Sequence, residues 1–272
     1  MPEITANGLR FFVEDQGTGA PIVLLHGFPD TSAVWRYQLP VLVEAGYRAI
    51  APDLRGRGRS ERPAQVEAYT LTTMVADVAG ILDALGVERA YVVGHDWGAA
   101  VAWLFAALRP QRVERLVTLS VGHPSARGKP TLEALQKGWY RLLFQFPGIE
   151  SALQADDWYL MRTLFQGAGD LDRYIADLSE PGALTAGLNW YRANMPPDRL
   201  TAPPPQLPPI QAPTLGVFST GDLYLTEDGM TRSAQFVREP WRYERIEGVG
   251  HWMQVEAPEQ INRLILNFLR PV

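Results

Sequence analysis

The stretch Gly94-His95-Asp96-Trp97-Gly98 decides how this chain folds. It follows the apolar, β-favouring run 90–93 and precedes the alanine-rich run 99–108, which favours a helix. The predicted order is therefore strand, sharp turn and helix. The two flanking glycines allow a tight bend, and such a turn pushes its central residue towards positive φ, which aspartate tolerates better than most residues.

A carboxylate at such a turn has its own chemistry. In a nucleophile elbow, the residue between strand and helix is displayed for attack, and serine hydrolases carry Ser at that position. Serine attacks a carbonyl and becomes acylated, whereas Asp96 attacks a saturated carbon and becomes an alkyl ester. The simpler interpretation is a glycine-bounded turn in which Asp96 only caps the following helix.

Composition limits the classes of protein that this chain can represent. Its 272 residues, of which 46% are hydrophobic and 20% charged, can form one large α/β domain or a domain with an insertion. The net charge of −5 does not favour a nucleic-acid partner or an anionic membrane surface. The sequence has no cysteine, which excludes disulfides and cysteine nucleophiles. We see no signal-peptide pattern and no apolar run long enough to cross a bilayer, so we expect a cytoplasmic protein.

Apolar patterning predicts alternating strands and helices in the first part of the chain. The expected strands are 9–14, 21–25, 47–51, 90–93 and 113–119, and the expected helices are 35–44, 71–85 and 99–108. This alternation indicates a mostly parallel, twisted sheet with helices on both faces. The alternation resumes late in the chain with strands at 214–219 and 242–246 and a helix at 258–269.

The middle of the chain breaks this pattern. It contains helix-like segments at 131–143, 152–165, 171–178 and 184–192, and a proline-dense linker at 203–209 ends it. We interpret residues 124–209 as a helical cap inserted into an α/β core, which residues 1–123 and 210–272 form.

One of the four histidines fits the role of a catalytic base. We expect structural roles for His26 and His95, and His123 lies at a strand end near the cap. His251 lies in a glycine-rich loop between the last strand and the last helix, where a hydrolase base belongs. Such a base needs a carboxylate on its other ring nitrogen, and Asp222 follows the preceding strand. The chain order is then nucleophile, acid and histidine.

Hydrolysis of an ester on Asp96 also needs an oxyanion hole. The backbone N–H of Trp97, at the start of the helix, is one candidate donor, and the N–H of Phe28, in a loop after a strand, is the second. Taken singly, each residue has a simpler interpretation: Phe28 packs in the core, and Trp97 lines the wall of the site. Together with Asp96, Asp222 and His251, the two donors favour a catalytic interpretation.

At this point the chain resembles a known family. It is similar to the epoxide hydrolases of the α/β-hydrolase fold, and to their sister group the haloalkane dehalogenases, in four motifs: His26-Gly27-Phe28-Pro29, Asp53-Leu54-Arg55-Gly56-x-Gly58-x-Ser60, Gly94-His95-Asp96-Trp97-Gly98 and Gly250-His251-Trp252. The resemblance covers nearly the whole chain and implies the α/β-hydrolase fold. These motifs do not separate the two activities.

Two cap segments point to the epoxide hydrolases. Segments 139–148 and 189–192 resemble those that carry the ring-opening tyrosines of soluble epoxide hydrolases, which implies that Tyr140 and Tyr191 lie over Asp96. Epoxide opening places negative charge on an alkoxide, and two phenols can hold the ring oxygen and protonate it. A halide leaves as an anion and needs only N–H donors. The simpler interpretation of both tyrosines is ordinary cap packing.

Three hypotheses follow. The first is hydrolysis of a small apolar epoxide to a vicinal diol, with water and with no metal or organic cofactor. The second is haloalkane dehalogenation by the same Asp–His–Asp set, with Trp97 and Trp139 as halide donors; the fluoroacetate dehalogenases carry an arginine where this chain has Trp97, which argues against that activity. The third is a ligand-binding protein that keeps a hydrolase fold, and a complete catalytic set argues against it.

Overall fold

The computed structural model describes residues 3–238 and 240–270. Within these residues one sheet of eight strands has the order β1-β2-β4-β3-β5-β6-β7-β8. The β1–β2 and β2–β4 pairs are antiparallel, and the other pairs are parallel. The strands are β1 (Glu3–Ala6), β2 (Leu9–Gln16), β3 (Ala20–Leu25), β4 (Tyr47–Pro52), β5 (Ala90–His95), β6 (Val113–Leu119), β7 (Thr214–Ser219) and β8 (Trp241–Ile246). The predicted α/β class with a mostly parallel sheet is confirmed.

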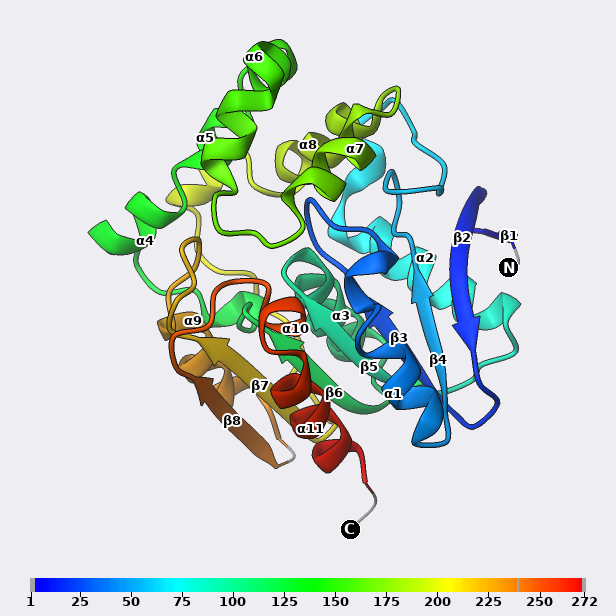
Figure 1. Ribbon diagram of the computed structural model, residues 1–272. Coiled ribbons are helices and arrows are strands. Elements are labelled where there is room, and N and C mark those ends of the chain that lie inside the picture. Colours follow the sequence, from blue (N-terminus) through cyan, green and yellow to red (C-terminus); the bar gives the residue numbers. More distant parts are fainter. Residues whose placement is uncertain (1–2, 239, 271–272) are drawn as a thin grey trace.

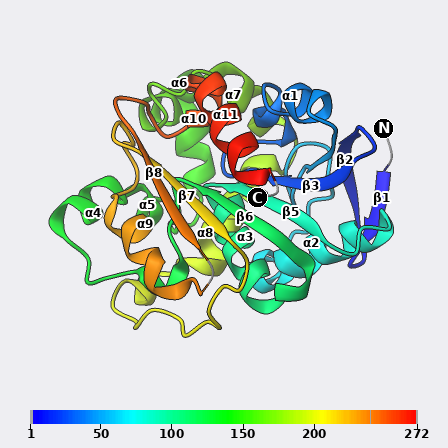
Figure 2. The same ribbon diagram turned by 90° about the horizontal axis from the view of Figure 1, so that it is seen from below.

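Helices cover both faces of this sheet. The α-helices are α1 (Leu39–Glu44), α2 (Leu71–Ala84), α3 (Trp97–Leu108), α4 (Leu132–Lys137), α5 (Tyr140–Leu143), α6 (Ile149–Leu164), α7 (Leu171–Ser179), α8 (Ala183–Asn194), α9 (Asp228–Arg232), α10 (Met253–Glu256) and α11 (Pro258–Leu269). The 3-10 helices are η1 (Ser32–Trp35), η2 (Val66–Tyr69), η3 (Pro110–Arg112), η4 (Pro124–Ala126), η5 (Pro197–Leu200) and η6 (Ser233–Phe236). Viewed from below, α1 and α11 lie on one face, and α2 and α3 lie on the other (Figure 2).

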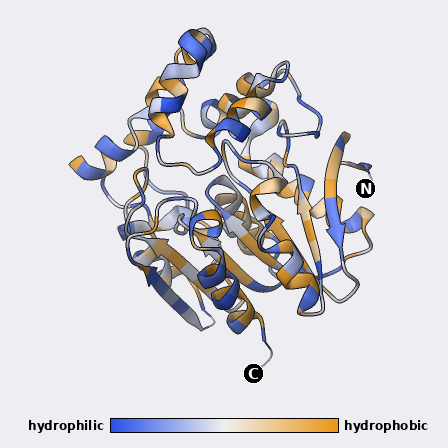
Figure 3. Ribbon diagram, in the orientation of Figure 1, coloured by the Kyte–Doolittle hydropathy of each residue, from blue (hydrophilic) through white to orange (hydrophobic). Residues whose placement is uncertain are grey.

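The central strands are hydrophobic because both of their faces are covered. Residues 22–25 of β3 and the pair Val92 and Val93 of β5 are fully buried. Figure 3 shows hydrophobic colour along the middle of the sheet and hydrophilic colour on the outer surfaces of the helices. Continuous burial of this kind is expected of parallel strands between two helical layers.

The regular structure between β6 and β7 is helical. Helices α4 to α8 lie on the side of the sheet to which the parallel strands point (Figure 1). In parallel α/β sheets, ligands bind at the carboxyl ends of the strands. The helices between β6 and β7 therefore lie next to the edge at which a site is expected.

Three predicted helices differ from those observed. The predicted helix at 131–143 is divided into α4 and α5 by a turn at 138–139. The predicted helix at 35–44 is wrong in its first part: η1 ends at Trp35, and α1 begins at Leu39 with Pro40 in its first turn. Proline lacks an N–H and suits a first turn, whereas inside a longer helix its ring would clash with the preceding turn. The predicted helix at 152–165 begins earlier, at Ile149, and non-helical angles at 155–158 interrupt it.

The sequence analysis also missed one strand. β1 is short, and it pairs with β2 at the edge of the sheet. Among residues 3–238 and 240–270, no helix combines the length and apolar character that crossing a bilayer requires.

Candidate active site

Asp96 lies in a strained turn at the carboxyl end of β5. Its φ of 53° and ψ of −122° are rare for a residue with a side chain, and strain of this kind concentrates at functional sites. The next residue begins α3, so the structure has the predicted order of strand, turn and helix. A Cβ on Gly98 would lie 2.0 Å from the Leu25 carbonyl oxygen, so only glycine fits there. The Asp96 side chain makes no capping hydrogen bond to α3, which argues against the simpler interpretation of a capping residue.

The two carboxylate oxygens of Asp96 have different surroundings. The backbone N–H of Phe28 donates to Oδ1 at 2.8 Å. A Cβ on Gly27 would lie 2.3 Å from the same oxygen, so glycine is required for this approach. Oδ2 instead faces Nε2 of His251 at 3.7 Å. The N–H of Trp97 belongs to the first residue of α3, and the first N–H groups of a helix have no partner within it.

His251 and Asp222 form a buried pair. Nδ1 of His251 lies 2.7 Å from Oδ2 of Asp222, and their side chains are 4% and 0% exposed. The other oxygen of Asp222 accepts hydrogen bonds from the N–H groups of Tyr224, at 2.8 Å, and Leu225, at 2.9 Å. A carboxylate held in this way fixes the orientation of the imidazole and turns Nε2 towards Asp96.

Nearby charges determine the protonation of this pair. Burial acts to lower the pKa of His251, but the charges of Asp222, Asp96 and Asp30 outweigh it and raise the pKa to about 9. Burial acts to raise the pKa of Asp222, but the charge of His251 and its hydrogen bonds hold that pKa below the usual value. At neutral pH an imidazolium therefore lies between carboxylates.

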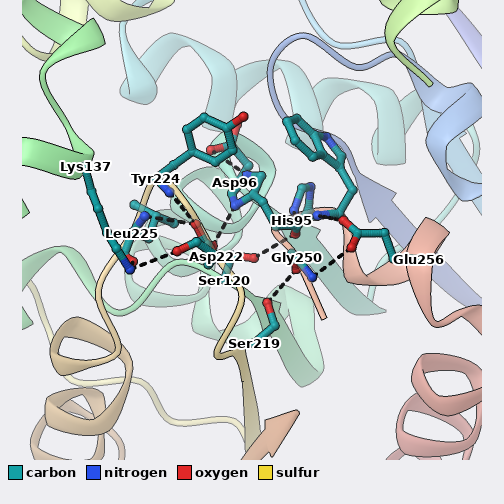
Figure 4. A network of polar contacts seen from close by, with 12 residues as sticks. His95, Asp96, Ser120, Lys137, Ser219, Asp222, Tyr224, Leu225, Gly250 and Glu256 are labelled. Atoms are coloured by element: carbon teal, nitrogen blue, oxygen red, sulfur yellow. Dashed lines mark hydrogen bonds and ion pairs between the residues drawn. The ribbon is translucent and has the colours of Figure 1, made fainter. Parts of the chain in front are cut away.

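Backbone contacts hold the loop that carries His251. Nε2 of His95 lies 2.9 Å from the His251 carbonyl oxygen, to which the Ser120 hydroxyl also donates at 3.3 Å. The N–H of Gly250 donates to Glu256 at 2.8 Å (Figure 4). His95 thus has the contacts of a structural residue, as its place beside the nucleophile predicts.

The other two histidines are engaged elsewhere. Nδ1 of His26 lies 2.8 Å from the carbonyl oxygen of Gly27, and its Nε2 accepts the N–H of Leu54 at 2.9 Å. Nδ1 of His123 accepts the N–H of Ser125 at 3.2 Å, and burial lowers the pKa of His123 to about 4. Of the four histidines, His251 is the one placed to act on Asp96.

The two predicted tyrosines lie together although 50 residues separate them in the sequence. The ring centroids of Tyr140 and Tyr191 are 5.9 Å apart, and both residues are buried. The ring of Tyr191 also lies 5.1 Å from that of Trp97 and 5.4 Å from that of Phe28. Tyr191 thus contacts the two residues that the oxyanion-hole prediction named.

The tyrosines remain proton donors at neutral pH. Burial raises the pKa of Tyr140, the charge of Arg141 opposes this increase, and the charge of Asp96 adds to it. Burial raises the pKa of Tyr191 well above its ordinary value, and the charges of Tyr140 and Asp96 act in the same direction. Phenols that keep their protons can donate to an oxygen that becomes negatively charged.

Sequence analysis missed two residues around the acid. The ring of Tyr224 lies 5.2 Å from that of His251 and 5.8 Å from that of Tyr140, so it joins the base to the cap. Nζ of Lys137 donates to the carbonyl oxygen of Asp222 at 2.9 Å (Figure 4). The position of Tyr224, two residues after the predicted acid, is a signal that could have identified it.

Asp30 is a further carboxylate that the sequence analysis passed over. It is fully buried, its Oδ2 accepts the indole N–H of Trp252 at 3.2 Å, and the same oxygen lies 3.8 Å from Nδ1 of His95. Its charge contributes to the raised pKa of His251. Asp30 directly follows the motif at 26–29, and this adjacency was the available signal.

The two tryptophans of the dehalogenase hypothesis differ in environment. Trp97 is buried and packs against Tyr191, whereas the side chain of Trp139 is 50% exposed. Trp139 makes none of the aromatic ring contacts found among the described residues. Its exposure makes Trp139 less suited than Trp97 to act as a halide donor in a buried site. In the described part of the chain, no group of three or more His, Asp or Glu side chains is arranged to hold a metal ion.

Comparisons with known proteins agree with this geometry. Residues 20–258 match the family described as the alpha/beta hydrolase fold. The chain is 37% identical to epoxide hydrolase A of Mycobacterium tuberculosis, over 98% of this chain and 96% of that protein. The crystal structure of epoxide hydrolase A from Mycobacterium thermoresistibile superposes with a TM-score of 0.84 at 33% identity, over 99% of this chain and 97% of that one.

A second solved structure extends the likeness to the full length. It belongs to the epoxide hydrolases found in metagenomes from hot environments and has a TM-score of 0.89 at 28% identity, over 100% of this chain and 98% of that one. The predicted family is confirmed: this chain belongs to the alpha/beta hydrolase fold family, and these relatives within the family are named epoxide hydrolases.

Proposed function

We propose that this protein is an epoxide hydrolase that forms a covalent ester on Asp96. The proposal is supported by one arrangement: a strained aspartate that faces an Asp–His pair, and two buried phenols whose pKa values the charge of that aspartate helps to raise. A carboxylate nucleophile suits attack on a saturated carbon, and the phenols suit an oxygen leaving group that needs a proton.

Asp96 attacks in the first step. Its Oδ1 is held by the N–H of Phe28, which leaves Oδ2 to form a bond to an epoxide carbon. The bond between that carbon and the ring oxygen breaks, and the ring oxygen takes a proton from Tyr140 or Tyr191. The products are an alkyl ester on Asp96 and a tyrosinate, which later regains its proton.

His251 acts in the second step. Esterification removes the negative charge of Asp96, one of the charges that raise the pKa of His251, so the imidazolium gives up its proton more readily, and by way of solvent this proton restores the phenol. The neutral Nε2 takes a proton from water as the water attacks the ester carbonyl. The N–H groups of Phe28 and Trp97 stabilise the oxyanion, and the intermediate collapses as the imidazolium protonates the leaving alkoxide, which releases a vicinal diol. The new carboxyl group of Asp96 then returns its proton to His251.

The surroundings of the site favour a substrate with an apolar body. Phe28, Phe144 and Trp97 pack around the ring of Tyr191 with centroid distances of 5.0 to 5.4 Å. We propose residues 124–209 as the cap that presents these tyrosines and residues 1–123 and 210–272 as the core. The proposed reaction consumes water and uses no cofactor. A cytoplasmic location stays a prediction.

A substrate panel tests the proposal. Aryl and alkyl epoxides and haloalkanes of matched size are offered to the enzyme, and diol and free halide are measured in parallel. We expect diol from the epoxides and little halide. Rapid halide release from the haloalkanes without diol formation from the epoxides would instead make the chain a dehalogenase. The absence of both products would favour a ligand-binding protein.

The tyrosines give a sharper test of the same proposal. Replacing either Tyr140 or Tyr191 by Phe leaves one donor, so turnover of a styrene-type epoxide should fall by about 10–100-fold. Replacing both should remove nearly all alkylation, because an unprotonated alkoxide in a dry site is costly. Single-turnover kinetics should then show slow alkylation of Asp96 and normal ester hydrolysis. If Asp96 of the double variant is alkylated at the wild-type rate, the two tyrosines only pack within the cap and do not donate a proton.

A further inference from the structure

An arginine follows each of the two tyrosines, and the two arginines have different partners. Arg192, after Tyr191, pairs with Glu150 at 2.8 Å and donates to the carbonyl oxygen of Phe144 at 3.1 Å. Its charge is neutralised within the cap. Arg141, after Tyr140, has no carboxylate within ion-pair distance among residues 3–238 and 240–270.

The guanidinium of Arg141 lies beside the reacting groups. Its Cζ is 5.7 Å from the centroid of the Tyr140 ring, and the residue is half-buried. The side chain folds back over the turn between α4 and α5, where a Cβ on Gly138 would lie 3.2 Å from Cζ. Burial acts to lower the pKa of Arg141, but a hydrogen bond with Tyr140 and the charge of Asp96 act to raise it, so the group stays cationic.

The other nearby cation is already engaged. Nζ of Lys137 donates to the carbonyl oxygens of Asp222 and Leu225, and it lies 3.3 Å from a Glu133 oxygen. Among the described residues, Arg141 is therefore the cation of this part of the cap that has no carboxylate partner. A partly desolvated cation without an anionic partner is unfavourable, and a bidentate carboxylate is the partner that guanidinium geometry matches best.

We propose that Arg141 binds a carboxylate of the substrate, so that the preferred substrates are epoxy acids with an apolar body and a carboxylate close to the ring. This inference rests on the proposed function. The protein carries a net charge of −5 and its nucleophile is itself an anion, so an anionic epoxide is repelled unless a cation compensates. Arg141 lies beside the ring of Tyr140, so the compensating charge is next to the phenol that is proposed to bind the ring oxygen.

A 3-arylglycidate fits this arrangement. Oδ2 of Asp96 attacks the carbon that bears the aryl group, the bond from that carbon to the ring oxygen breaks, and the oxygen on the neighbouring carbon takes the tyrosine proton. Water then cleaves the ester and gives a 2,3-dihydroxy acid. The carboxylate is unchanged throughout, and Arg141 offsets its charge while a second negative charge develops beside it.

Two substrates and three variants test this inference. The substrates are trans-3-phenylglycidate and trans-β-methylstyrene oxide, which have a similar body and differ in the charge. In Arg141→Gln we expect the ratio of kcat/KM for the anionic over the neutral substrate to fall by about 10–100-fold, chiefly through KM. Arg141→Lys should restore part of the ratio, because an ammonium keeps the charge without the bidentate geometry. Arg162→Gln removes the same charge from an exposed ion pair on α6 and should leave the ratio at the wild-type value.

The outcomes separate the inference from the proposed function. Equal losses on both substrates in Arg141→Gln would mean that the guanidinium tunes the phenol or supports the cap, and a wild-type ratio in this variant would mean that no carboxylate binds there. Either result overturns the inference while epoxide hydrolysis stands. A wild-type protein that turns over neither epoxide overturns the proposed function itself.

Discussion

The proposed mechanism gives Asp96 two successive roles, and its two oxygens have contacts that suit them. The Phe28 N–H on Oδ1 marks the oxygen that becomes the ester carbonyl, and the open side of Oδ2 faces His251 at 3.7 Å. Because that separation is too long for a hydrogen bond, Oδ2 keeps its electron density for attack. The same base that leaves the nucleophile free is then placed to act on the ester.

His251→Gln separates these two roles. The variant should alkylate Asp96 but fail to hydrolyse the ester, because glutamine cannot take a proton from water, and steady-state turnover should fall by at least about 100-fold. Intact-protein mass spectrometry should show the mass of one substrate added. The control is the double variant with Asp96→Asn, which should gain no mass. Continued diol formation at the wild-type rate would assign the base to another residue.

The pH dependence of ester hydrolysis follows from the charges around His251. The imidazole must be neutral to act, and the charge of Asp96 helps to raise its pKa to about 9 in the free enzyme. Esterification removes that charge, so the pKa falls. Single-turnover hydrolysis of the ester should therefore increase with pH and level off with a midpoint below 9, as rapid-quench measurements can determine. A midpoint at or above this value would contradict the argument.

Residue types and chain order made the principal site residues predictable. Asp96, Asp222 and His251 each follow a strand, and the carboxyl ends of parallel strands meet at one edge of the sheet, so their proximity could be expected. The special position of Arg141 could not be predicted in this way. Its distinguishing feature is the lack of a partner that Arg192 has, and a pairing of this kind is visible only in space.

At the scale of the elements, the loops that follow β3 and β4 hold the segment that carries the backbone N–H of Phe28. The carboxylate of Asp53 accepts the N–H groups of Ser32 and Arg59, at 2.8 and 3.0 Å, and so joins the loop after β3 to the loop after β4. Arg57 is fully buried and donates to the carbonyl oxygens of Pro29, Asp30 and, at 3.4 Å, Ala183 of α8. Arg57 therefore joins the Phe28 loop to α8, the helix that carries Tyr191.

Neighbouring arginines of this loop should differ in their effect on stability. Arg57→Ala removes donors to three carbonyl oxygens and leaves a cavity under Phe28, so we expect a loss of about 2–4 kcal/mol in the free energy of unfolding. Arg59, two residues away, has an exposed side chain, and Arg59→Ala should cost about 1 kcal/mol or less. Urea denaturation measures both. Equal losses of unfolding free energy in the two variants would show that the buried contacts of Arg57 do not stabilise the fold more than the exposed side chain of Arg59 does.

The sequence predicted some elements better than others for physical reasons. Strands β3 and β5 contain continuous apolar runs, at 21–25 and 90–93, because both faces of the sheet are covered there, and this pattern is strong. The prediction of a helix at 35–44 was wrong in its first part because the apolar periodicity continues across the turn at 36–38, which separates η1 from α1. The interruption of α6 at 155–158 places Asp156, Asp157 and Trp158 at positive φ, and no local pattern in these residues signals such a bend.

At the scale of the whole molecule, the sheet brings three distant segments to one edge and buries their charges there. His251 is protonated in the folded protein up to pH values near 9, whereas its ordinary pKa is 6.5. A folded pKa above the unfolded one adds stability that is fully present below pH 6.5 and is lost as the pH rises through 9. The lowered pKa of Asp222 has the opposite pH dependence. The stability that it contributes is present above pH 3.8 and is lost as the pH falls below that value.

This linkage predicts how the catalytic pair affects overall stability. A shift from 6.5 to about 9 corresponds to about 3 kcal/mol, and Asp222 is the main charge behind it. Replacing Asp222 by Asn should lower the pKa of His251, so the wild type should exceed the variant most in unfolding free energy near pH 6. The difference should shrink by about 1–3 kcal/mol as the pH rises to 9.5, because the wild type alone loses the contribution. Urea denaturation of both proteins across this range measures it, and groups outside the pair cancel in the comparison. A difference that stays constant with pH would mean that His251 is neutral in the folded enzyme, and the charge-driven activation of the base would have to be abandoned.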